Sequence, residues 1–171
     1  KKTFTYGRIE ARIKFPGGKG TWPAFWMMGN SGNWPNCGEI DIMEHVGSIP
    51  NRASFALHTV EKNGTRGNNW HSTKMFDYSL ADDFHTYAVE WAQEEKDGKD
   101  VIRFFVDGVQ YAEQWEAKID NNDSWPFNKP HFIILNLAIG GTMGGSVDDA
   151  IFNVPRIMYV DYVRVYQRTE K

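Results

Sequence analysis

Residues 6–15 alternate between apolar and charged side chains. This period of two predicts a half-buried β-strand. Pro16-Gly17-Gly18 follows and predicts the turn that ends the strand. The apolar face carries Ile9, Ala11, Ile13 and Phe15, and the polar face carries Arg8, Glu10, Arg12 and Lys14.

Short apolar or alternating segments recur along the rest of the chain, separated by turn residues. Asp107-Gly108 between two of them predicts a hairpin turn. No segment has the sustained 3.6-residue period of an amphipathic helix, so we expect an all-β sandwich or barrel. The further strands are expected at 22–28, 39–46, 52–59, 84–92, 101–106, 109–115, 131–139 and 157–166.

Composition narrows the class of protein. The 171 residues fit one domain, expected to span 1–171. With 19 Lys and Arg against 22 Asp and Glu, the net charge is −3, which argues against a nucleic-acid partner. No apolar run reaches the roughly 18–20 residues of a membrane span, so no membrane association is expected. The single cysteine, Cys37, excludes an internal disulfide and is expected to be a buried free thiol.

Three carboxylates lie within six residues of an otherwise apolar strand, at Glu39, Asp41 and Glu44. In a regular strand Glu39 and Asp41 share a face, but Glu44 points the other way. One bulge residue at Ile42 or Met43 would return Glu44 to the face of Glu39. We therefore expect all three carboxylates on one face.

Such a row of like charges needs a reason. A solvated acidic edge would not require the apolar residues between the carboxylates, and calcium ligands usually come from a curling loop. Glycoside hydrolysis fits better, because retention of configuration uses two carboxyls about 5–5.5 Å apart. Crowding is expected to raise the pKa of at least one of them, which would keep it protonated as an acid.

The aromatic residues support a sugar substrate. Seven tryptophans exceed the needs of a core. Trp22 and Trp26 are four residues apart on one strand face and could stack on sugar rings. Trp34 and Trp125 are expected at loop rims, with Trp125 as a further substrate-binding residue, whereas Trp91 is expected in the core. The polar face around Arg8 is either plain solvent-exposed surface or the floor of a ligand cleft.

The stretch Glu39-Ile40-Asp41-Ile42-Met43-Glu44 resembles the signature of glycoside hydrolase family 16, in its bulged form. The resemblance to bacterial laminarinases of that family covers nearly the whole chain. It includes the segments 6–14, 22–28, 84–91, 106–108, 135–141 and 160–166.

The resemblance implies a concanavalin-like β-jelly roll and retaining endo-hydrolysis of β-1,3-glucan, with mixed-linkage β-1,3-1,4-glucan as a possible second substrate. Glu39 would be the nucleophile, Asp41 its assistant and Glu44 the general acid/base. No cofactor is implied for catalysis, and a structural calcium ion is possible. The resemblance further assigns Trp22 and Trp26 as sugar platforms, Arg8 as a cleft-floor residue, His58 as a weaker contact near Glu44, and Asp161 as a calcium ligand.

Several alternatives stay open. A non-catalytic β-glucan-binding protein would use the same fold, although binding alone does not need three carboxylates. An agarase, a carrageenase or a transglycosylase of the family would share the same motif. Compared with the family, the chain is expected to be missing the usual N-terminal strands, and if it is truncated, self-association through exposed strand edges is expected. Secretion is expected from the polymeric substrate.

Overall fold

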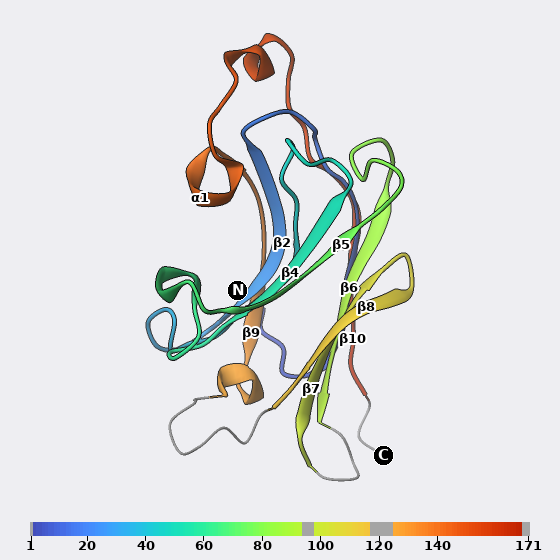
Figure 1. Cartoon of the computed structure of the whole chain (residues 1–171). Helices are drawn as coiled ribbons and strands as arrows, with labels where there is room; N and C mark the ends of the chain where they lie inside the picture. The colour runs from blue at the N-terminus through green and yellow to red at the C-terminus, as the bar shows by residue number, and fades with distance from the viewer. Residues whose placement is uncertain (1, 94–97, 117–124, 169–171) are drawn as a thin grey trace.

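The computed structural model describes residues 2–93, 98–116 and 125–168 and contains two five-stranded antiparallel sheets (Figure 1). We call them the β3 sheet, with order β5-β4-β3-β2-β9, and the β1 sheet, with order β10-β1-β6-β7-β8. The strands are β1 Gly7–Lys14, β2 Thr21–Gly29, β3 Glu39–Glu44, β4 Arg52–His58, β5 Trp70–Met75, β6 His85–Gln93, β7 Asp100–Val106, β8 Val109–Trp115, β9 His131–Ile139 and β10 Tyr159–Tyr166.

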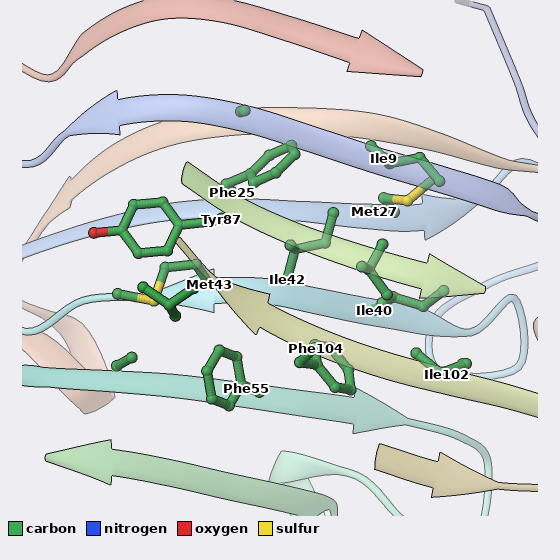
Figure 2. Packing of buried hydrophobic residues seen from close by; sticks show 14 of the residues in the cluster. Ile9, Phe25, Met27, Ile40, Ile42, Met43, Phe55, Tyr87, Ile102 and Phe104 are labelled. Carbon is green, nitrogen blue, oxygen red and sulfur yellow. The ribbon is translucent and has the colours of Figure 1, made fainter. Parts of the chain in front are cut away.

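One face of each sheet packs against the other and forms the core (Figure 2). Ile9 from β1 and Phe104 from β7 meet Phe25 from β2, Ile40 from β3 and Phe55 from β4, and all five are fully buried. The alternation of each strand puts one set of side chains into this layer and leaves the other set on the outer surface. The all-β sandwich expected from the sequence is therefore confirmed.

The predicted strands are all present, but β5 was not expected. Its sequence, from Trp70 to Met75, is mostly polar. The strand lies at the edge of the β3 sheet and every second side chain is exposed, so the sequence contains no apolar run that would predict it. Among the described residues, helices are limited to segments of three to five residues, and none is long and apolar enough to span a membrane. These are η1 Gly64–Arg66, η2 Pro126–Asn128, α1 Gly141–Gly144 and η3 Asp149–Asn153.

Candidate active site

A β-bulge in β3 brings the three carboxylates to one face, as predicted. On the neighbouring strand β2, Trp26 pairs with Asp41 and Phe25 pairs with Met43, so Ile42 is the extra residue. Ile42 and Met43 are both fully buried in the core. The bulge thus turns two successive side chains inward, and Glu39, Asp41 and Glu44 all lie on the outer face of the β3 sheet.

Each carboxylate has a nitrogen donor or close partner from a neighbouring segment. The Trp34 indole donates to Glu39 Oε2 at 2.5 Å, and the Trp22 indole donates to Glu44 Oε1 at 3.0 Å. The third, Asp41, is 3 % exposed, and its Oδ2 lies 3.1 Å from His58 Nε2. The site therefore holds its acidic groups at fixed positions before any ligand binds.

The pKa values of all three carboxyls are raised, first of all by burial. For Glu39, burial and the nearby charge of Asp41 raise the pKa to about 8. The pKa of Asp41 is raised well above its usual range by burial and then by the charge of Glu44. For Glu44, burial raises the pKa against the hydrogen bond from Trp22, which lowers it. Burial therefore favours the protonated form of all three carboxyls, and the crowding by like charges that the sequence predicted adds to this effect.

A hollow of about 320 Å³ opens beside Glu44, on the side of β4 and β5. Arg52 and Ser54 from β4 and His71 from β5 contribute to its wall, and Met143 from α1 closes one side. The sequence analysis did not identify these residues. The alternating pattern of β4 and β5 could have shown that these residues point outward. Placing them next to Glu44 also requires knowing which strands pair with one another.

The described residues contain one group of side chains close enough to hold a metal ion together. Ligand atoms of Glu39, Asp41 and His58 lie within 4.8 Å of one another. These are also the groups that would handle protons in acid–base chemistry, so their proximity has an explanation without a metal.

Comparison with known protein families gives a match over most of the chain. Residues 1–160 match the description of "Glycosyl hydrolases family 16". The chain belongs to glycosyl hydrolase family 16. It is 40 % identical to a beta-glucanase of Rhodothermus marinus, over 99 % of this chain and 60 % of that protein.

Solved family 16 structures share the fold of this chain. The laminarinase catalytic domain of Thermotoga maritima superposes with a TM-score of 0.88 at 34 % identity, over 99 % of this chain and 67 % of that one. A laminarinase of Flavobacterium sp. gives a TM-score of 0.84 at 42 % identity, over 98 % and 69 %. The chain thus spans about 60 % of the curated beta-glucanase and about two thirds of these solved chains.

Two of the other residues expected at this family 16 site lie beside the carboxylates. Trp26 pairs in register with Asp41, and its indole donates to Asn136 on β9 at 2.7 Å. His58 pairs in register with Glu39 and contacts Asp41, rather than the expected Glu44.

Trp34, expected at a rim, is 39 % exposed and is also a direct partner of Glu39. His45, which directly follows Glu44 in the chain, is fully buried against Phe15.

The structure corrects the expected place of Arg8. Its strand belongs to the β1 sheet, and its side chain makes ion pairs with Glu10 and Glu90, each at 2.9 Å, on the outer face of that sheet. The alternating pattern correctly predicted one polar face, but it does not say to which sheet the strand belongs. Arg8 therefore lies on plain outer surface and not on the floor of the site.

The contacts of Trp125 and Asp161 are with residues other than the three carboxylates. The Trp125 indole donates to Asp100 on β7 at 2.8 Å, and its ring packs edge-on against Phe127. Asp161 on β10 pairs with Arg12 at 2.9 Å. A calcium ion needs six to eight oxygen ligands. Within the described residues, no group of three His, Cys, Asp or Glu side chains close enough to share an ion includes Asp161, and the calcium ion stays a prediction.

Proposed function

We propose that this chain is a retaining endo-β-1,3-glucanase that cleaves laminarin-like chains, with mixed-linkage β-1,3-1,4-glucan as a second substrate. The observation that carries the proposal is the bulged row of Glu39, Asp41 and Glu44, each with a fixed partner, on a face that also carries Trp22 and Trp26. The family relationship and the names of its relatives support it.

In this proposal Glu44 is the general acid and Glu39 the nucleophile. The raised pKa of Glu44 favours its protonated form, from which it can give its proton to the glycosidic oxygen as the bond breaks. Glu39 forms a glycosyl-enzyme with the sugar that remains. Glu44, now ionised, takes a proton from water, which attacks the same carbon and releases the sugar with its configuration retained.

The residues around the three carboxylates leave room for the sugars on both sides of the bond that is cleaved. Trp22 and Trp26 offer flat apolar surfaces on the β2 side of the carboxylates, suited to the sugars on the non-reducing side. The leaving sugar must lie beside Glu44, where the hollow provides space. A site that admits water as the attacking group also admits an acceptor sugar in its place, so product analysis at high oligosaccharide concentration separates hydrolysis from transglycosylation.

Reducing-sugar release from laminarin tests the proposal. We expect the wild-type chain to be active with retention of configuration, and Glu39→Gln to lose at least about 10³-fold in kcat while still binding laminarin oligosaccharides. Glu90→Gln on the outer face of the β1 sheet is the matched control and should keep its activity. Glucan binding without turnover in the wild-type chain would refute the enzyme and favour a glucan-binding protein.

We further propose secretion, because a polymeric glucan is met outside the cell. Self-association is also proposed, through the end strands β9 and β10, whose exposed apolar side chains include Leu135, Ile139, Val163 and Tyr166. Sedimentation of the wild-type chain and of Val163→Lys tests the self-association, and a monomer at all concentrations would exclude it.

A structural calcium ion stays a prediction. A calcium-dependent rise in Tm that Asp161→Asn abolishes would support it.

A further inference from the structure

The hollow beside Glu44 has a floor of small side chains on β4. Ser54 pairs in register with Glu44, and Ala56 lies two residues further along the same face. These two residues are 7 % and 3 % exposed, and their short side chains leave depth that a larger residue would fill. On the edge strand β5, the exposed residues Thr73 and His71 pair with Ser54 and Ala56 and form the wall of the hollow. A ligand on this floor therefore lies next to Glu44.

Arg52 stands at one end of this floor. It precedes Ser54 by two residues, so it shares the same face and is a diagonal neighbour of Glu44, with their Cα atoms about 7–8 Å apart. The Arg52 backbone is held on both sides. Its N–H donates to the carbonyl of Ile49 at 3.1 Å, and its carbonyl oxygen accepts from the buried His45 ring at 3.2 Å. The base of the Arg52 side chain is therefore fixed relative to Glu44.

The guanidinium of Arg52 carries a charge without a counterion. Within the described residues Arg52 forms no ion pair, and its Nε is buried without a hydrogen-bond partner. Glu44 is the only carboxylate among the described residues around the hollow. Burial raises the pKa of Glu44 and the charge of Arg52 lowers it, although the two groups do not form an ion pair. As the proposed general acid, Glu44 is protonated when the leaving sugar is bound, so it does not neutralise Arg52 at that stage.

A neutral leaving sugar would not compensate this charge. A sugar that enters the hollow displaces water from the guanidinium, and a charge that loses water without gaining a counterion costs free energy. The other polar side chains around the hollow each offer a hydrogen-bond donor and no negative charge; they are Ser54, Asn69, His71 and Thr73. A guanidinium binds a carboxylate through two parallel N–H bonds, and a sulfate ester presents a similar pair of oxygens. The donor set therefore suits an anionic oxygen group.

We propose that the hollow binds an acidic substituent of the leaving sugar, a carboxylate or a sulfate ester, with Arg52 as its counterion. The proposal deepens the glucanase function proposed above and rests on it for the direction in which the glucan crosses the site. It adds a substrate class, namely β-1,3-glucans that carry uronic acid or sulfated sugars. Cleavage at the bond before such a sugar leaves it at the non-reducing end of the released fragment.

Laminarin whose primary alcohols are partly oxidised to carboxylates tests the substrate class, and partly sulfated laminarin is the second arm. Mass spectrometry of the released fragments locates the acidic sugar. We expect it at the non-reducing end at least about fivefold more often than random cleavage gives, because a partly buried charged pair exceeds the range of exposed pairs. Enrichment in one arm alone identifies the group as carboxylate or as sulfate. Random placement in both arms would overturn the proposal.

Arg52 has a competing explanation, as a group that only adjusts the pKa of Glu44. In that case Arg52→Gln changes kcat/KM on neutral and on acidic laminarin by the same factor, and that result would overturn the proposal. We expect the variant instead to lose at least about fivefold on acidic laminarin relative to neutral laminarin. Arg52→Lys keeps the charge without the paired donors, so it should retain part of the preference. Arg66→Gln, on an exposed residue outside the hollow, is the matched control and should retain all of it.

Binding measurements separate failure of the acidic-substituent site from failure of the glucanase function. Calorimetry with Glu39→Gln compares neutral and acidic laminarin oligosaccharides of equal length without cleavage. We expect an at least about fivefold lower Kd for the acidic one at low salt, a smaller difference at high salt, and none when Arg52→Gln is added. If the wild-type chain cleaves no laminarin but this difference is seen, the glucanase fails and the anion site stands. Equal Kd values would overturn the anion site even if laminarin is cleaved.

Discussion

The Trp22 indole donates the hydrogen bond that most directly stabilises ionised Glu44, the proposed acid/base. Trp22→Phe removes this N–H and keeps an aromatic ring. A hydrogen bond to a charged group contributes about 1.5–3 kcal/mol, and one pKa unit corresponds to about 1.36 kcal/mol. The contact is 3.0 Å long and largely shielded from water, so the pKa of Glu44 should rise by at least about one unit.

The sign of the effect follows from the role of Glu44. A general acid must be protonated, so its pKa sets the basic limb of kcat/KM against pH. Raising that pKa should move the basic limb to higher pH by about one unit. Weaker stacking of a sugar on phenylalanine lowers kcat/KM at every pH by the same factor and does not move the limb.

The assay is the initial rate of reducing-sugar release from laminarin between pH 4 and pH 9 at constant ionic strength. Trp26→Phe is the matched control, because its indole donates to Asn136 and to no carboxylate. It should lower kcat/KM without moving the basic limb. A Trp22→Phe profile whose basic limb stays in place, or moves to lower pH, would refute the assignment of Glu44 as the acid that this indole tunes.

Two other predictions concern Glu39. Trp34→Phe removes the N–H that favours ionised Glu39, so the acidic limb of kcat/KM should move to higher pH while the basic limb stays; the same pH series checks this, and an unmoved acidic limb would contradict it. The pKa of Glu39 is raised to about 8 in the folded chain from about 4.3 in the unfolded one, so its contribution to stability is full below about pH 4.3 and is lost as the pH rises through 8. Glutamine cannot ionise, so the Glu39→Gln variant does not lose this stability as the pH rises. The Tm of the variant minus the Tm of the wild type, measured by calorimetry, should be larger at pH 8 than at pH 5 by at least about 2 °C. An equal Tm difference at the two pH values would show that Glu39 is not buried as an acid.

The family-level site was readable in the sequence because its signals are local. The period of two in β3 and the two successive apolar residues Ile42 and Met43 were enough to predict the bulge. Both apolar side chains belong in the core, and burying a polar side chain there in place of one of them would cost free energy. The same local logic correctly predicted that Cys37 is a buried free thiol and that Trp91 belongs to the core.

Only the tertiary structure decided which faces meet. Arg8 and Glu39 each lie on the polar face of an alternating strand, yet one strand joins the β1 sheet and the other the β3 sheet. An alternating pattern reports that one face is buried, whereas strand pairing depends on contacts between segments far apart in the chain. For the same reason the partnership of His58 with Asp41 and Gly64 appears only when β3, β4 and the loop that follows β4 are folded together.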